Sequence, residues 1–304
     1  MTPVKLDVAL ASVSLVFVYA AMAIYTISFL IFVFHIARAT SEKKSIREAS
    51  SGLQRAGFIV MGIGALAHGI GVVTRGVSAS RVPWANMYEF SISGSFLIVL
   101  IFMTALAVKE IRVIAAFVNA FALLVLGVAT TTFYVQIKTL MPALQSYWLV
   151  IHVTVAVLAT AFFNIAAALA VAYLLREWDW VQKSSNPLAK LVRRVLKVFP
   201  DSAKLERLSY RFNVVGFILW SFTLIAGAIW AERAWHRYWG WDTKEVWTFI
   251  IWTIYAGYLH ANATRGWSGK RSAWLALVGF AAILFNFTIV NLFFKGLHVY
   301  SGLK

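Results

Sequence analysis

The sequence has 304 residues, of which 61% are hydrophobic and 13% are charged, against roughly 25% charged in an average soluble domain. This number of charged side chains is too small to cover the surface of a soluble protein of this length. The composition therefore excludes a soluble globular protein and predicts an integral membrane protein. The chain has no cysteine, which excludes disulfides, cysteine-ligated zinc, iron–sulfur clusters and thiol catalysis within it. The formal net charge is +16, and the distribution of the basic residues decides between a nucleic-acid partner and a topology signal.

A membrane-spanning helix needs about 20 consecutive, largely apolar residues. The first apolar segment is longer than the roughly 7–15 residues of a signal-peptide core, so we expect it to be retained as a helix. The sequence therefore predicts an all-α polytopic membrane protein, with residues 1–304 forming a single membrane domain. Eight segments meet the length criterion: 9–37, 56–74, 88–108, 112–133, 147–175, 210–231, 245–262 and 272–294.

Basic residues are unevenly distributed over the two sides of these spans. The connections that follow the odd-numbered spans hold 19 of the 28 Lys and Arg residues, and the opposite side, with both termini, holds 9. Because cytoplasmic connections carry the excess of Lys and Arg, we expect both termini to lie outside. The basic excess is then mostly a topology signal, and we expect no nucleic-acid partner.

The longest cytoplasmic connection, 177–209, contains a short amphipathic helix near 187–199. Asn186 and Pro187 are typical of a turn followed by a helix start. The pattern favours a helix that lies on an anionic lipid leaflet, and an ordinary solvated linker helix remains the alternative. Apolar and basic residues occupy complementary faces, Leu188, Leu191, Val192, Val195 and Leu196 on one and Lys190, Arg193, Arg194 and Lys197 on the other.

The six histidines are candidates for function because ionisable residues in membrane spans are costly. A lone histidine is more often a neutral ring bonded to a neighbouring carbonyl or hydroxyl group. Imidazole is also an axial ligand for haem iron, and without cysteine the chain is better equipped for haem than for a closed zinc site. The predicted topology places His152, His236 and His298 at the outer face, His68 nearer the outer end of its span, and His35 and His260 near inner ends.

The stretch 230–247 holds five of the 13 tryptophans. The interfacial aromatic belt explains tryptophans at helix ends, whereas Trp239-Gly240-Trp241 inside a loop would form a flat apolar wall for a planar ligand; both interpretations remain open. Asp242, with Glu245 three positions later, predicts a helix N-cap with a capping box.

A haem bound at the outer face would need cationic partners for its propionates, since Asp242 would repel them. Arginine suits bidentate pairing with carboxylates, and simple solvation in the loops is an equally good explanation for each arginine. The outer-face candidates are Arg75, Arg81, Arg233 and Arg237.

Residues 239–247 (Trp-Gly-Trp-Asp-Thr-Lys-Glu-Val-Trp), running on to 255–260, resemble the tryptophan-rich signature of the WWD haem-handling superfamily, which serves cytochrome c maturation. Three more stretches, 83–90, 142–152 and 296–300, resemble segments of the CcsA/ResC type of the System II pathway. The resemblance covers a haem-handling core over 56–304. Residues 1–55 add an N-terminal span and a basic cytoplasmic loop.

The resemblance implies a role for each matching residue. His152 and His298 would be the axial ligands of a haem b at the outer face, and His260 would bind haem deeper in the membrane. A separate CcsB/ResB-like membrane partner would supply the second inner ligand, a place that His35 could take, although no motif supports it. His236 departs from the family pattern, which has a small residue there, and His68 lies outside the motifs. The platform residues would be Trp235, Trp239, Gly240, Trp241, Asp242 and Trp247.

The implied function is that of a subunit of a System II cytochrome c synthase (haem lyase) complex in the cell membrane. It would convey haem to the extracytoplasmic face and present it for thioether attachment to the C-x-x-C-H motif of apocytochrome c, whose thiols a thioredoxin-like reductant maintains indirectly. No residue of this chain would act beyond positioning and ligation. Alternatives are a System I-like haem chaperone, which is shorter, and a b-type electron-transfer cytochrome. A further alternative, a transporter without a cofactor, would leave the tryptophan-rich stretch 230–247 (the tryptophan loop) unexplained.

Overall fold

The computed structural model describes residues 6–41, 51–107, 109–140, 144–264, 266–294 and 296–298. All regular structure within these ranges is helical, which confirms the predicted all-α class. In chain order the α-helices are α1 (Val8–Ser41), α2 (Ser51–Ser78), α3 (Met87–Thr104), α4 (Ala115–Thr131), α5 (Tyr147–Glu177), α6 (Asp179–Lys183), α7 (Pro187–Lys197), α8 (Ser202–Trp235), α9 (Thr243–Thr264), α10 (Lys270–Phe285) and α11 (Asn291–Phe293). Two 3-10 helices, Ala105–Ala107 and Lys109–Ile114, lie between α3 and α4, and a π-helical turn, Asn286–Val290, joins α10 to α11.

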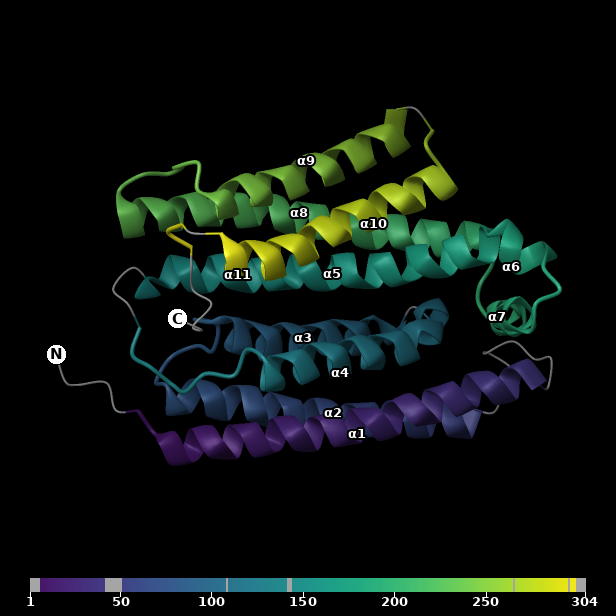
Figure 1. Cartoon of the computed structure of the whole chain (residues 1–304), viewed down its shortest axis with the longest axis horizontal. Helices are drawn as coiled ribbons and strands as arrows, with labels where there is room; N and C mark the ends of the chain where they lie inside the picture. Colours follow the sequence, from purple (N-terminus) through teal and green to yellow (C-terminus); the bar gives the residue numbers. More distant parts are fainter. Residues whose placement is uncertain are drawn as a thin grey trace.

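Seven of the described helices are long and apolar enough to cross a membrane: α1 to α5, α8 and the α10–α11 unit. They match seven of the predicted spans, so the chain is a polytopic membrane protein. The eighth predicted span, 245–262, coincides with α9, which runs along the same bundle (Figure 1) but is not among the seven. The start of α1, the α8–α9 loop and α11 lie at one end of the bundle, opposite α6 and α7. We call these the outer and inner ends, after the predicted topology.

Helices α1 and α2 form a close pair at one edge of the bundle (Figure 1). Glycines of α2 recur every seven residues against α1: a Cβ atom on Gly57 would lie 2.8 Å from the Phe32 ring, and one on Gly64 would lie 2.7 Å from the Tyr25 ring. The Ser28 hydroxyl donates to the Gly57 carbonyl at 3.0 Å. Small residues that admit a neighbouring helix are typical of membrane helix interfaces. The additional N-terminal span is therefore packed into the bundle.

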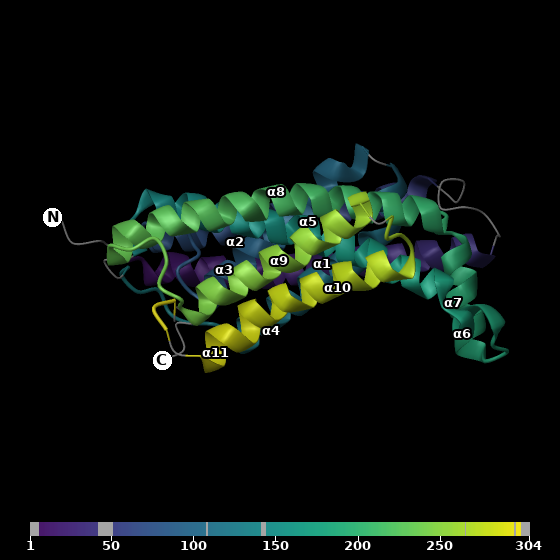
Figure 2. The ribbon, with the colours of Figure 1, turned by 90° about the horizontal axis from the view of Figure 1, so that it is seen from above.

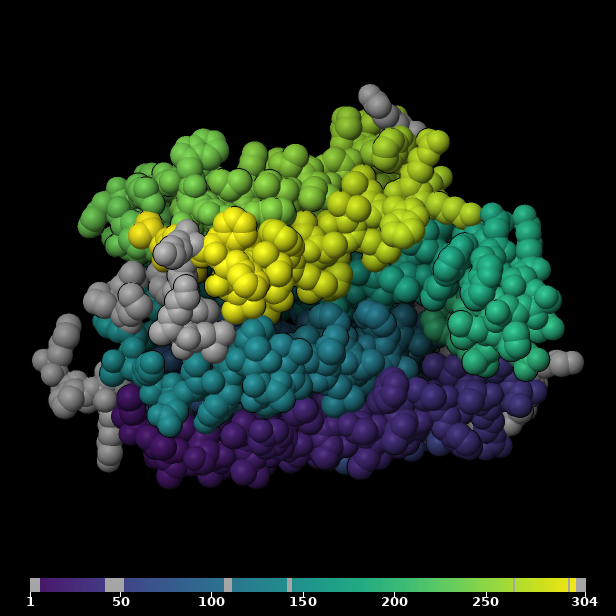
Figure 3. All heavy atoms as spheres, in the orientation of Figure 1, coloured from purple at the N-terminus to yellow at the C-terminus, as the bar shows by residue number. Residues whose placement is uncertain are grey.

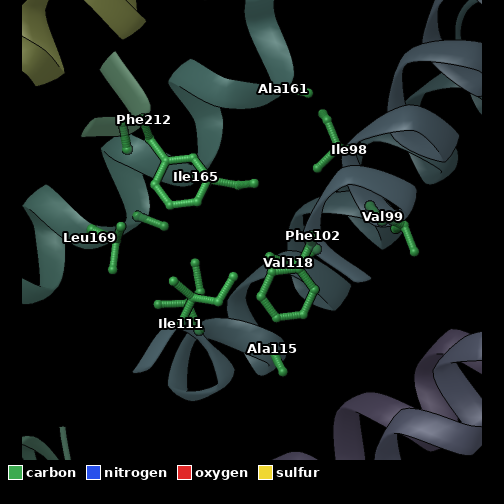
Figure 4. Packing of buried hydrophobic residues seen from close by; sticks show 14 of the residues in the cluster. Ile98, Val99, Phe102, Ile111, Ala115, Val118, Ala161, Ile165, Leu169 and Phe212 are labelled. Carbon is green, nitrogen blue, oxygen red and sulfur yellow. The ribbon is translucent and has the colours of Figure 1, made fainter. Parts of the chain in front are cut away.

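Helices α3, α4 and α5 join this pair to the rest of the bundle. Figure 4 shows Ile98 and Phe102 of α3, Val118 of α4 and Ile165 of α5 pointing into one shared core, where all four are buried. On the face seen in Figure 3, α10 lies beside α4. The contact includes Phe121 and Phe280, whose ring centroids are 6.3 Å apart. This packing joins α10 to the core formed by α3, α4 and α5.

Helix α7 confirms the predicted short helix after Asn186, whose side chain accepts the Leu188 N–H at 2.8 Å. It is seen end-on in Figure 1 and runs across the direction of the bundle in Figure 2, so it lies crosswise to the spanning helices. Ala189 and Leu196 are buried, whereas Leu188 and Leu191 are more than half exposed. This orientation suits a helix in the plane of the inner membrane surface, and its contact with lipid stays a prediction.

Candidate functional site

An apolar cavity of about 270 Å³ opens among α3, α5, α8, α9 and the π-helical turn. It reaches from the outer end towards the middle of the bundle. Its walls include Phe90, Ile98, Leu149, Trp220 and Phe287. An apolar cavity with a few convergent polar groups is the usual form of a small-molecule site. The polar groups here include His152, His298, Lys244, Glu245 and Asn286.

His152, in the second turn of α5, is held in one orientation by α8. Its Nδ1 lies 3.0 Å from the Thr223 carbonyl oxygen. Since a carbonyl oxygen only accepts hydrogen bonds, Nδ1 carries the proton and Nε2 is the nitrogen left for a metal. The imidazole stacks on Trp230, with centroids 5.9 Å apart and 17° between the planes.

His298, which follows α11, is held by Asp242, the residue immediately before α9. Its Nδ1 lies 2.7 Å from Asp242 Oδ2, and Asp242 Oδ1 accepts the Leu297 N–H at 3.0 Å. Partial burial opposes ionisation of Asp242, but the hydrogen bond from His298 and the backbone N–H groups outweigh it and lower the pKa of this carboxyl. An ionised Asp242 keeps the proton on Nδ1, so Nε2 of His298 is again left for a metal.

Trp230 of α8 brings the two histidines into one site. Its ring is 5.9 Å from that of His152 and 5.4 Å from that of His298, centroid to centroid, and Trp235 lies 4.8 Å from His298. Trp230 itself is 2% exposed. Sequence reasoning placed Trp230 at the start of the aromatic stretch but not among the site residues. The structure shows that this indole contacts both predicted axial ligands.

The tryptophan loop is ordered by the glutamate half of the capping box that the sequence predicts. Glu245 Oε2 accepts the N–H of Gly240 at 2.8 Å and that of Asp242 at 3.1 Å, which fixes the entry into α9. The Asp242 side chain contacts the Lys244 N–H only at 3.4 Å, because its oxygens are turned towards the 297–298 segment. Asp242 thus positions a histidine in addition to starting the helix.

The predicted platform tryptophans lie in different places. Trp239 lines the cavity. Trp241 is 78% exposed, and Trp247 packs on Phe285 with centroids 4.4 Å apart. Gly240 lies against the Arg237 guanidinium, into which a Cβ atom would run. Of these tryptophans, Trp239 is the one that the structure places in the described cavity wall, and a platform role for the others stays a prediction.

Two of the predicted propionate partners are engaged elsewhere. Arg75 Nε lies 3.1 Å from Glu89 Oε1, and Arg81 Nη1 lies 2.5 Å from Glu89 Oε2. Glu89 is fully buried, so the three side chains form a buried ionic cluster at the outer ends of α2 and α3. Arg233 pairs with Glu232 at 3.5 Å and is exposed, as is Arg237. None of the four arginines is among the described residues that line the cavity.

Lys244 is a cavity residue that sequence reasoning missed. Its Nζ donates to the Asn286 carbonyl at 2.8 Å and to Asn291 Oδ1 at 2.9 Å. The Asp242–His298 contact and this one therefore both tie the start of α9 to the C-terminal segment. The available signal was a cation in the first turn of a helix, where the helix dipole disfavours positive charge.

The other histidines are not part of the cavity wall. His260 is exposed on α9, and His236 is exposed at the end of α8, with a φ of 57°. His68 is buried in α2, with Nδ1 3.3 Å from the Tyr25 hydroxyl. His35 is buried in α1, which lies across the bundle from α9 (Figure 1), so the structure does not bring His35 to His260.

Comparison with known proteins gives a consistent result. Residues 84–298 match the family described as "Cytochrome C assembly protein". The chain is 31% identical over 290 residues to the cytochrome c biogenesis protein CcsA of Trichodesmium erythraeum, covering 75% of this chain and 83% of the relative. It is 34% identical to CcsA of Guillardia theta, covering 76% and 80%.

A solved structure, the cytochrome c haem lyase CcmF, superimposes with a TM-score of 0.66 at 15% identity, covering 91% of this chain and 46% of that one. This likeness shows a shared fold. The family match extends from Trp84 beside the cavity to His298 and includes both histidines and the tryptophan loop. The chain therefore belongs to the cytochrome c assembly protein family and is of the CcsA type.

Proposed function

We propose that this chain binds haem at the outer end of the bundle and presents it to apocytochrome c for thioether attachment, with His152 and His298 as axial ligands. One observation carries the proposal: both imidazoles face the same cavity beside one indole, and both have Nδ1 committed to a fixed acceptor. A fixed Nδ1–H bond that orients the ring is the usual environment of a metal-bound histidine.

The haem, as haem b, is the cargo and substrate of the reaction. The apolar walls and Trp239 suit a planar macrocycle, and two neutral imidazoles hold its iron. In the attachment step each apocytochrome thiol adds across a vinyl double bond, so that one carbon gains sulfur and the other the thiol proton. The acceptor supplies both nucleophiles in its C-x-x-C-H motif, so this chain contributes positioning and ligation.

His260 supports the involvement of a second chain. Its imidazole is exposed on the outside of α9, where a neighbouring membrane protein can reach it. We propose a CcsB/ResB-like partner that supplies the opposite ligand of an inner haem. The complex would work at the extracytoplasmic face of the cell membrane as a haem lyase, the activity in the name of the solved CcmF relative, with a thioredoxin-like reductant acting indirectly.

The visible absorption spectrum of the protein purified with its partner from haem-replete cells tests the proposal. We expect wild type to contain low-spin haem, and His152→Ala and His298→Ala to alter the spectrum in a way that added imidazole restores. His236→Ala is a matched control because His236 is an exposed outer histidine away from the cavity. Absence of haem from the wild type would contradict the proposal, and His260→Ala reports separately on the inner site through haem occupancy.

A further inference from the structure

Lys244 places an amino group in the cavity wall, which is otherwise largely apolar. It is the one Lys or Arg among the described residues that line the cavity, where it lies with His152 and His298. Its two hydrogen-bond acceptors, the Asn286 carbonyl and Asn291 Oδ1, are neutral oxygens. An ammonium group has three N–H donors, so these contacts leave one donor for another group. Burial lowers the pKa of Lys244 to about 7, and a carboxylate beside it would favour the charged form.

The two nearby carboxylates, Asp242 and Glu245, direct oxygens to donors other than Lys244. The oxygens of Asp242 accept from His298 and from the Leu297 N–H. Glu245 directs Oε2 to the N–H groups of Gly240 and Asp242, and its buried Oε1 accepts no hydrogen bond from the described residues. Both carboxylates thus hold the loop and the histidine, and neither forms an ion pair with Lys244 within 4.0 Å in the described part of the chain.

We propose that Lys244 binds a carboxylate of the cavity ligand and thereby sets which edge of the macrocycle faces the acceptor. This inference rests on the proposed function, because haem carries its two propionates on one edge and its vinyl groups away from them. A charge in a largely apolar cavity interacts more strongly with an opposite charge than it would in water. With a propionate anchored at Lys244, rotation of the ring about the two histidines is restricted and the vinyl groups keep a defined position.

None of the four outer arginines supplies a cation to the described cavity wall. Arg75 and Arg81 are paired with buried Glu89. Arg233 and Arg237 are exposed and lie outside the cavity wall. Lys244 also lies at the start of α9, where the helix dipole favours an anion. The loop thereby supplies an anion-binding group next to the ligand of the iron.

The test compares the binding of haem with that of haem dimethyl ester, in which both propionates are neutralised. The whole chain with its partner, freed of haem, is titrated with each compound and followed by absorption. We expect the wild type to bind haem at least about tenfold more tightly than the ester, because a charge-assisted hydrogen bond contributes about 1.5–3 kcal/mol. Lys244→Met should bind both compounds with similar affinity, and Lys244→Arg should retain the preference.

Asn291→Leu separates this role from a purely structural one, because it removes one partner of Lys244 and keeps the ammonium group. We expect this variant to retain the preference for haem over the ester. If Lys244→Met weakens the binding of the two compounds equally, Lys244 only stabilises the start of α9 and the inference is overturned. If the wild type binds neither compound, the proposed function itself fails, which is a different outcome from equal binding of both.

Discussion

Gly227 of α8 lies directly against the imidazole of His152: a Cβ atom on Gly227 would come within 2.8 Å of Cε1 and 2.9 Å of Nδ1. Because the same ring is bonded to the Thr223 carbonyl one turn earlier on α8, it cannot move away without losing that bond. The absence of a side chain at 227 is therefore part of how this histidine is positioned.

Gly227→Ala should displace the ring and weaken haem binding. Overpacking of this kind costs about 1–3 kcal/mol, which corresponds to about tenfold or more in affinity. Haem occupancy and the visible spectrum with and without added imidazole measure the effect. Gly127→Ala is the matched control, since a Cβ atom on Gly127 has nothing within 4 Å. Equal occupancy in the two alanine variants would contradict this account of the site.

Asp242→Asn should weaken the hold of His298 on the iron. The amide keeps nearly the same shape but loses the negative charge that polarises the imidazole, so we expect haem affinity to fall by about 10- to 100-fold, as for other residues behind a metal ligand. The midpoint potential should rise, because a less electron-rich imidazole favours ferric iron less. A spectroelectrochemical titration checks both effects, and an unchanged potential and affinity would show that Asp242 serves the helix start alone.

Arg75→Met should destabilise the fold and leave the haem spectrum unchanged. Removing Arg75 leaves Glu89 buried with Arg81 as its remaining ionic partner, so we expect a cost below the roughly 3–5 kcal/mol of a buried charge left without any partner. Thermal unfolding in detergent, read beside the absorption spectrum, provides the measurement. Loss of haem with normal stability would instead support the role of Arg75 as a propionate partner.

Gly64→Ala should loosen the pairing of α1 and α2. Its Cβ atom would lie 2.7 Å from the Tyr25 ring, whereas one on Gly62 meets its nearest atom, in Met103, at 3.4 Å. We expect the first substitution to cost about 1–3 kcal/mol of unfolding free energy. Gly62→Ala should be tolerated in the same thermal unfolding experiment. Similar behaviour of the two variants would show that the N-terminal span is only loosely attached.

The sequence was informative wherever the signal is local. Hydropathy located seven spans, because twenty apolar residues identify a membrane helix without reference to neighbours. The capping box of Glu245 was also readable, since its partners lie within five residues. Pairings between side chains of different helices are not readable in this way. Arg75 and Arg81 are therefore propionate candidates by sequence, whereas the structure pairs both with Glu89.

In the site, too, local features are predicted from the sequence and contacts between distant segments are not. His152 and His298 were candidates from position and motif, but only the fold shows that Trp230 lies against both rings and that Asp242 turns towards His298. The sequence suggested a row of tryptophans as one platform. The loop geometry separates them, leaving Trp241 exposed and Trp239 in the wall.

The two histidines are attached to the protein in unequal ways. His152 belongs to a helix of 31 residues, so moving its backbone requires breaking the repeating hydrogen bonds of α5. His298 lies in a turn beyond the last helix and is held from outside by Asp242. If both histidines bind the iron as proposed, an incoming imidazole from an acceptor protein would meet one fixed and one exchangeable ligand. The product should leave from the His298 side, while His152 keeps its contact with the iron until last.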